Sequence, residues 1–288
     1  GYQALTANTT GTRNTAIGAN SSDTNSTGNY NTAVGQGSLH ANTTASQNTA
    51  LGDSALYTNT TGSLNTAVGQ GAMYYNTTGA NNVALGVASL EANTTGTENI
   101  AIGYQALVAN TTASYNIAIG GNALDTNTTG ASNVALGYSA MYANSTGANN
   151  VAIGHASLDS NTTASNNTAV GSGSLGVNTT GASNTAVGKG AGSAVTTGSG
   201  NTLIGMDAAN HGVSLTTGSN NVIIGDSSDT SASGSAGQIV IGPDVSGVAN
   251  NTVTFGFTSS TASLGLDGSD TSWAAASDER YKENIEAS

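Results

Sequence analysis

The chain lacks several residue types that globular proteins commonly use for stability and catalysis. It has no cysteine, one proline and one tryptophan among 288 residues, and only 7% of its residues are charged. Without cysteine no disulfide can form, so backbone hydrogen bonds and burial must supply the stability. Aromatic residues make up only 5%, which excludes a thick core of interdigitated rings.

The charge and the hydrophobic pattern exclude two classes of partner. The formal net charge is −12, and only four residues are Lys or Arg. Nucleic acids are bound by clustered basic side chains, so we expect no nucleic-acid partner. No run of 18 apolar residues occurs, so we expect no membrane insertion. Gly1 lies inside a repeat, so we expect a cut end there, and the lack of a signal peptide does not indicate a location.

A 17-residue repeat occupies most of the chain. A fixed period of this length is typical of a solenoid in which one repeat forms one coil. Glycine and β-branched residues recur in every unit without a 3.6-residue pattern, which argues against helices. The sequence therefore predicts an all-β parallel β-solenoid with strands stacked about 4.8 Å apart. The repeated segment, NTAIG in its first copy, begins at Asn14, Asn31, Asn48, Asn65, Asn82, Asn99, Asn116, Asn133, Asn150, Asn167, Asn184 and Asn201.

Each predicted strand has two apolar faces. Ala stands two places before the repeated Gly, as at Ala16 and Ala33, and Ile, Val or Leu stands directly before it, as at Ile17 and Val34. Neighbouring residues in a strand point to opposite faces, so we expect both faces to be buried. One face fits inside a narrow coil that admits only Ala. The other face needs a partner, and a further copy of the chain is the simplest one.

Two further columns carry Leu or Met and Asn. Leu or Met stands four places after the Gly, and a triplet of the type Asn-Thr-Thr follows, as at Asn42 and Asn59. Identical amides stacked at strand spacing can hydrogen-bond along the column. The triplets also match the N-glycosylation sequon. Because they recur in register with every coil, we interpret them as a structural ladder.

Three columns hold the variable residues, one, five and twelve places after the Gly. All charged residues and histidines of the regular repeats fall in these columns, so we expect them to face solvent. Tyrosine planes can stack on sugars, which makes this surface a candidate for binding a host glycan or receptor. Exposed charged columns are, however, commonly only solvated. The candidate surface-binding residues are Tyr74, Tyr104, Tyr138 and Tyr142.

No motif indicates a metal or a cofactor. Calcium-binding β-rolls carry acidic turns, whereas these turns carry Asn and Thr. His40, His155 and His211 lack the spacing of zinc ligands. Gly188-Lys189-Gly190 lacks the spacing of a phosphate-binding loop. We therefore expect no metal site and no cofactor.

Two alternative functions remain open from the residues. Glu91, Asp125 and Asp159 share one outer column at about 9.6 Å intervals, close to the carboxylate separation of an inverting glycosidase, so a glycan-cleaving tailspike is one alternative. No pocket is predicted around them that would raise a pKa, so solvated carboxylates are the simpler interpretation. The other alternative is an ice-binding β-solenoid, against which no outward Thr-x-Thr pair recurs in every coil.

The chain divides into three predicted segments. Residues 1–205 form the 17-residue-repeat β-solenoid, a shaft or head. After Gly205 the register breaks and the only proline, Pro243, appears, so residues 206–276 are predicted to form an irregular β-rich neck. Residues 277–288 are rich in charge and are predicted to be a helix or an extended tail.

The repeat NTAIG…GYQAL…NTTG in residues 1–205 resembles the head repeats of YadA-like trimeric autotransporter adhesins and similar repeats of phage tail fibres. The resemblance implies a left-handed parallel β-roll and a homotrimer. The segment from Trp273 to Glu286 is similar to the start of the endosialidase-type intramolecular chaperone of tail fibres, although Tyr281 stands where Leu is commoner. That family cuts itself with a Ser and a Lys five residues on, which implies Ser277 and Lys282 as self-cleavage residues in a full-length precursor.

The sequence thus predicts a structural and adhesive extracellular fibre rather than a metabolic enzyme. Such a fibre would belong to a phage tail (virion) or to a bacterial cell surface. Its partners would be further copies of itself and a host-surface glycan or receptor.

Overall fold

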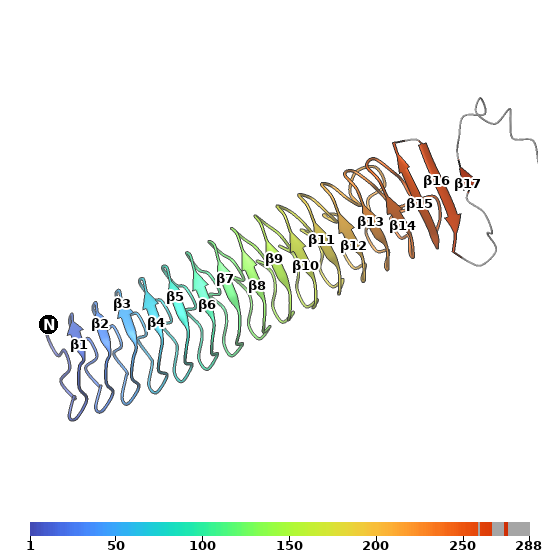
Figure 1. The fold of residues 1–288 in the computed structure, drawn as a ribbon. Coiled ribbons are helices and arrows are strands. Elements are labelled where there is room, and N and C mark those ends of the chain that lie inside the picture. Colours follow the sequence, from blue (N-terminus) through green and yellow to red (C-terminus); the bar gives the residue numbers. More distant parts are fainter. Residues whose placement is uncertain (259, 267–273, 276–288) are drawn as a thin grey trace, which may run out of the picture. The chain divides into compact units, whose positions relative to one another are not determined.

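The computed structural model describes residues 1–258, 260–266 and 274–275. It is an all-β parallel β-solenoid of about 14 coils with about 17 residues each, and the described residues contain no helix (Figure 1). The predicted solenoid and its coil length are therefore confirmed. The chain forms two compact units, Gly1–Asn166 and Asn167–Ser288, which are described separately below.

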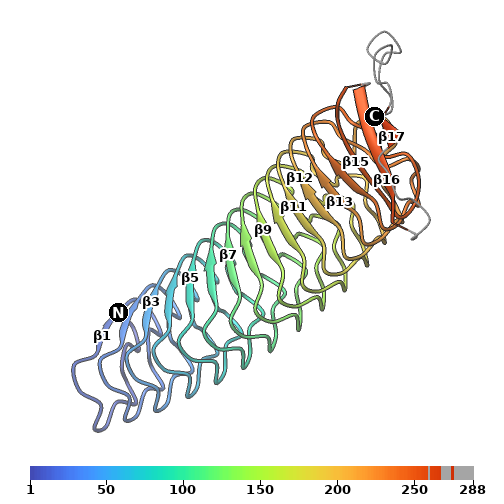
Figure 2. The same ribbon diagram turned by 45° about the vertical axis from the view of Figure 1, so that its right-hand side comes forward.

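The first unit contributes one three-residue strand per coil. Each strand pairs in parallel with the next one in the sequence, and the register advances by 17 residues, as from Ala101 to Ala118. Figures 1 and 2 show these strands side by side in sequence order. The strands are β1 (Thr15–Ile17), β2 (Thr32–Val34), β3 (Thr49–Leu51), β4 (Thr66–Val68), β5 (Val83–Leu85), β6 (Ile100–Ile102), β7 (Ile117–Ile119), β8 (Val134–Leu136) and β9 (Val151–Ile153).

The second unit begins with the same pattern and ends differently. Strands β10 to β15 pair in parallel in sequence order, whereas β15, β16 and β17 pair antiparallel. The strands are β10 (Thr168–Val170), β11 (Thr185–Val187), β12 (Thr202–Ile204), β13 (Val222–Ile224), β14 (Ile239–Ile241), β15 (Thr252–Phe257), β16 (Ser260–Gly265) and β17 (Ala274–Ala275).

Hydrogen bonds between coils extend well beyond the strands. In one coil the Leu39 N–H donates to the Ala55 carbonyl of the next coil, and the Gln47 N–H donates to the Asn29 carbonyl of the previous one, both at 2.9 Å. Each coil is thus bonded to both neighbours at its bends as well as at its strand. Backbone groups in these bends are satisfied by the stack itself, as buried polar groups require.

Left-handed residues make the bends that close each coil. In a representative coil these are Ala88, Leu90 and Glu98, with φ angles of 55°, 53° and 57°. Non-glycine residues adopt this region at an energetic cost, so the stacking must compensate for it in every coil. The repeated Gly after each strand is a stricter requirement, because Gly103 has φ +133° and a Cβ there would lie 2.6 Å from the Gly120 carbonyl oxygen.

The interior is narrow and filled by small and medium side chains. The predicted inward face of alanines is confirmed, and the Leu and Met column packs beside it. The fully buried members of these two columns in the first unit are Ala33, Ala50, Ala67, Ala84, Ala101, Ala118, Ala135 and Ala152, with Leu39, Leu56, Met73, Leu90, Leu107, Leu124, Met141 and Leu158.

The coil stacking continues beyond Gly205, where the repeat pattern had predicted its end and an irregular neck over residues 206–276. The step from Asn201 to Asn221 is 20 residues rather than 17, yet β12 and β13 pair in parallel with Thr202 opposite Val222. The extra residues are accommodated at a bend, where the Asp229 carboxylate accepts N–H groups of the inserted loop, including that of His211 at 3.0 Å. A changed step hides the period in the sequence, although the coil itself persists.

Candidate binding surface

The Asn-Thr-Thr column forms the predicted amide ladder. The Asn110 Nδ2 donates to Asn93 Oδ1 at 2.9 Å and to the Ala113 carbonyl at 3.0 Å, and its own Oδ1 accepts from Asn127 Nδ2 at 3.2 Å. These side chains are fully buried. The sequon asparagines therefore serve the interior of the folded coil, which confirms the ladder interpretation.

A second amide ladder was not foreseen from the sequence. It is formed by the Asn that opens each NTAIG-like segment: the N–H of Asn99 donates to Asn82 Oδ1 at 2.9 Å, and the Asn99 Nδ2 donates to the Ala113 carbonyl of the next coil at 2.9 Å. In the second unit the ladder runs through Asn201 to Asn221. The invariance of this Asn within the repeats was the available signal.

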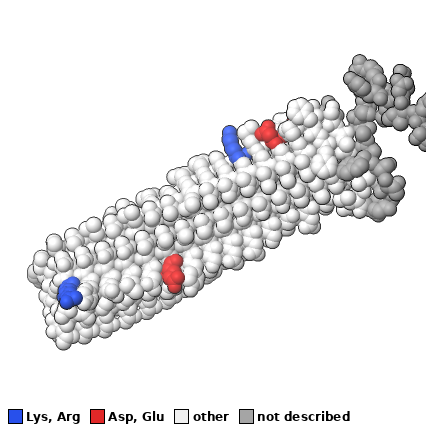
Figure 3. Space-filling view, in the orientation of Figure 1, with Lys and Arg blue, Asp and Glu red and all other residues white. Residues whose placement is uncertain are grey.

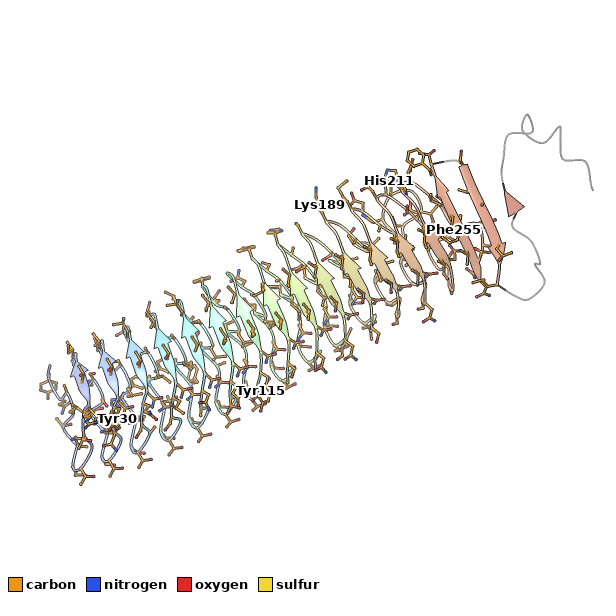
Figure 4. All side chains as sticks on the ribbon, viewed as in Figure 1. Tyr30, Tyr115, Lys189, His211 and Phe255 are labelled. Atoms are coloured by element: carbon orange, nitrogen blue, oxygen red, sulfur yellow. The ribbon has the colours of Figure 1, made fainter. Side chains whose placement is uncertain are left out.

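The three variable columns lie on the outside, as expected, and their charged residues are exposed or half-buried. Figure 3 shows a face on which charged side chains are few and widely separated among uncharged ones. The column twelve places after the Gly carries Tyr30 and Tyr115, which project from the same edge of the coils in the first unit (Figure 4). Arg13 donates to the Tyr30 hydroxyl at 2.7 Å and lies 5.1 Å from its ring centre.

Two of the predicted surface-binding tyrosines share one column and are well exposed. Tyr104 is 58% exposed and Tyr138 is 57% exposed, with Gly121 between them in the intervening coil. Tyr138 stacks on His155 of the next coil, with ring centres 5.8 Å apart and planes at 11°. The ring planes therefore follow the stacking of the coils, and their edges face solvent.

Tyr74, the third candidate, belongs to a continuous aromatic stack. His40 and Tyr57 have ring centres 4.7 Å apart, Tyr57 and Tyr74 have centres 5.0 Å apart with planes at 7°, and Tyr75 meets Tyr74 edge-on at 4.7 Å. At the other end, the Asp23 carboxylate lies 2.6 Å from His40 Nδ1. The sequence pattern did not single out this stack, although the 17-residue spacing of its rings was visible.

Tyr142, the fourth candidate, lies between two carboxylates. It is 40% exposed and occupies the coil between those of Asp125 and Asp159. Desolvation raises the pKa of Asp125, and it also raises the pKa of Asp159, where the nearby His155 partly opposes the effect. No pocket lies within the described part of the chain, so these carboxylates have no enclosed substrate site around them.

Threonines form a regular outer column at a bend. The second Thr of each triplet is exposed in every coil of the first unit, while the hydroxyl of the first is bonded to the backbone of the next coil, as from Thr77 to the Thr94 carbonyl at 2.9 Å. The exposed members are Thr10, Thr27, Thr44, Thr61, Thr78, Thr95, Thr112, Thr129, Thr146 and Thr163.

The outward face of the strands is apolar. In the first unit Ile17 is 59% exposed, Leu51 and Leu85 are 46% exposed, and Ile119 is 38% exposed. No strand from β1 to β9 contains a charged residue. The sequence predicted that this face is covered, and in the single chain it is open.

Ser277 and Lys282, the predicted self-cleavage residues, lie outside the described residues. Within the described ranges no group of three His, Asp or Glu side chains is arranged to hold a metal ion. The same ranges contain no helix with the length and apolar character to cross a membrane.

Comparison with known proteins gives no relative. No family model matches the chain, and neither a curated protein nor a solved structure matches it. Functional argument therefore rests on the surfaces of the solenoid.

Proposed function

We propose that the chain is the shaft of a homotrimeric extracellular fibre that presents a binding surface, in a phage tail or on a bacterial cell. The observation that carries this proposal is the apolar outward face of the strands. Isolated apolar residues are normal on a surface, but a contiguous uncharged row repeated in nine successive coils is typical of an interface. The dense ladder of bonds between coils suits a protein that must resist unfolding outside the cell.

Another copy of the same chain is the best-matched partner for this face. Its outward side chains recur once per coil, so a second copy offers the same spacing and can interlock with it along the whole row. Such matching is the basis of symmetric homo-oligomers. Three copies, and the left-handed winding, follow from the resemblance to adhesin heads and tail fibres.

Assembly can be tested by placing a charge on the face. We expect light scattering to give a trimer for the wild type and smaller species for Val68→Asp and Ile102→Asp, because each subunit would bury an unpaired carboxylate at a cost of several kcal/mol. Asn149→Asp is the matched control, since it adds the same charge at an exposed bend. A folded wild-type monomer, or normal trimers of both strand variants, would contradict the proposal.

The exposed tyrosines Tyr104, Tyr138 and Tyr142 are proposed to contact a host-surface glycan or receptor. Their substitution by Ser is expected to leave folding intact, because their side chains are largely exposed, and to weaken binding of the fibre to host cells. Unchanged cell binding by the triple variant would remove these residues from the proposed surface.

Self-cleavage is proposed only for a precursor that carries the rest of the chaperone domain. A serine hydroxyl becomes nucleophilic when a nearby base, here Lys282, removes its proton. Wild-type precursor is expected to release a C-terminal fragment on a denaturing gel, while Ser277→Ala and Lys282→Ala remain whole. Equal behaviour of all three would assign Ser277 to a helix N-cap instead.

The regular column of exposed threonines favours a second candidate function, the ordering of ice-like water. The column repeats in every coil of the first unit, as such a surface requires, but it is a single row at a bend. Thermal hysteresis of the purified protein, compared with a Thr78→Lys/Thr95→Lys variant, decides this. No hysteresis in the wild type excludes ice binding.

A further inference from the structure

The aromatic stack of His40, Tyr57 and Tyr74 ends beside an open position on the surface. Tyr57 stacks on His40 and also covers Gly37 of the preceding coil, where an added Cβ would lie 3.1 Å from the Tyr57 ring. The ring therefore fills the corner formed by His40 and Gly37. The same corner recurs two coils later.

In that second corner Tyr74 replaces His40 and Gly71 replaces Gly37, each 34 residues further on. The residue at the place of Tyr57 is Glu91, whose chain leaves the corner open: an added Cβ at Gly71 would meet no atom within 4 Å. The floor of the corner and one stacking face are thus retained, while the ring that covers the first corner is replaced by a carboxylate.

The charges around this corner are negative and unpaired. Among the described residues the Glu91 carboxylate forms no ion pair, and Lys and Arg number only four in the whole sequence. The pKa of the Tyr74 phenol is raised, first by desolvation and then by the neighbouring Tyr57, Tyr75, Asp53 and Glu91. Asp53 and Glu91 therefore both act electrostatically on this corner.

We propose that the corner formed by Tyr74, Gly71 and Glu91 binds the guanidinium group of an arginine from a partner polypeptide. A guanidinium is flat, so it can take the place over Tyr74 that the Tyr57 ring takes over His40. It is also cationic, so it gains from the ring face and from the Glu91 carboxylate. The chain contains a precedent for the charge pairing, since His40 stacks on Tyr57 and pairs with Asp23.

An arginine fits these features better than a sugar or a lysine. A pyranose is thicker than the single ring that fills the first corner and gains nothing from two carboxylates. A lysine ammonium is a compact point charge that lacks the flat face and the paired donors of arginine. The inference concerns one chain, so it stands or fails independently of trimer formation.

The test uses the whole chain and two short peptides, acetyl-Gly-Arg-Gly-amide and its citrulline counterpart, which has the same shape without the charge. Saturation-transfer NMR is expected to show binding of the arginine peptide with a Kd on the order of millimolar, as befits one exposed contact, and binding of the citrulline peptide at least about tenfold weaker. Glu91→Gln is expected to raise the Kd of the arginine peptide about tenfold, whereas Glu98→Gln, in another outer column, leaves it unchanged.

A second variant blocks the corner without altering the backbone. Gly71→Gln is expected to fold, because Gln105 adopts the required left-handed conformation at the equivalent position, and to abolish binding. Gly173→Gln is its matched control, since an added Cβ at Gly173 also meets nothing within 4 Å but no aromatic stack adjoins it. The proposal is overturned if both peptides bind equally, if neither binds, or if Gly71→Gln binds like the wild type. Binding of methyl glucoside that Gly71→Gln abolishes, without binding of the arginine peptide, would assign the corner to a sugar.

Discussion

The regular coils of the first unit and the coil around β12 in the second solve the same packing problem with different residues. In the first unit an inward Ala of each strand packs with a Leu or Met column and a ladder of Asn. Around β12 the inward strand residue is Leu203, the Leu column holds Gly192, and Val195 stands in the Asn column. An added Cβ at Gly192 would lie 2.5 Å from Leu203, so the large and small residues have exchanged places.

This difference shows what the coil requires. The interior volume must be filled, but either column can supply the large side chain. The Asn-Thr-Thr ladder can be replaced by apolar residues where the amide and its partners are lost together. The other ladder, from Asn184 to Asn201 and Asn221, continues through the same coils. The repeated Gly after the strand also remains, at Gly205 and Gly225.

The largest expected effect concerns the glycine that both regions keep. Gly103→Ala should lower the free energy of unfolding by about 4 kcal/mol, because the residue has φ +133° and the added Cβ lies 2.6 Å from a backbone oxygen of the next coil. Urea denaturation at fixed protein concentration measures the loss. Gly121→Ala is the control, since its Cβ would meet only the Tyr138 ring at 3.4 Å. Similar losses in both variants would contradict the argument.

The next effect places in the first unit the residue type that the second tolerates. Asn110→Val should cost about 3 kcal/mol, because the Asn93 oxygen and the Ala113 carbonyl lose a donor inside the stack. Val is tolerated at position 195, where the ladder ends. Asn149→Ser, at an exposed bend, should change the urea midpoint little. A neutral Asn110→Val would mean that the ladder contributes no net stability.

A smaller effect tests the exchange of large and small residues directly. Gly192→Leu should cost about 2 kcal/mol through overpacking against Leu203, although Leu175 has the same left-handed backbone one coil earlier. Adding Leu203→Ala should restore most of this loss, because the double variant has the pattern of the regular coils. Additive losses in the double variant would show that the two positions do not share one space.

The smallest effect is a dependence on pH that is specific to the outer column of the first unit. Desolvation raises the folded-state pKa of Asp125 and of Asp159, so the folded state binds protons more tightly than the unfolded state does. Stability should therefore fall slightly as the pH rises from about 4, the ordinary value for Asp, through the raised values. Asp125→Asn/Asp159→Asn should show a smaller fall in its urea midpoint over the same range. An equal fall would assign the dependence to other groups.

The sequence predicted much of the fold because the period carries it. Ala33 and Ile17 alternate within short strands, and a residue such as Asn42 recurs at the same step, so the inward alanines and the amide ladder could be expected. The persistence of coils beyond Gly205 could not, because three added residues shift the period while Asp229 holds the enlarged bend in place. The second amide ladder was missed because its Asn was treated as part of the strand motif.

The surface was harder to predict, since column membership does not determine how side chains lie. Tyr74 and Tyr104 are both outer tyrosines, yet one ends an aromatic stack and the other stands beside Gly121 with its ring exposed. Which ring meets which neighbour depends on the lean of each side chain across a coil.

The sequence by itself determined the solenoid, its coil length and its inward faces, because a 17-residue period with fixed Gly and Asn positions admits one repeating set of backbone bonds. The tertiary structure decided where the register could stretch and how Leu203 and Gly192 share one space. It also decided which outer corner stays open beside Tyr74. These properties depend on contacts between neighbouring coils, which stacking brings within about 5 Å of each other although they lie 17 or 20 residues apart in the chain.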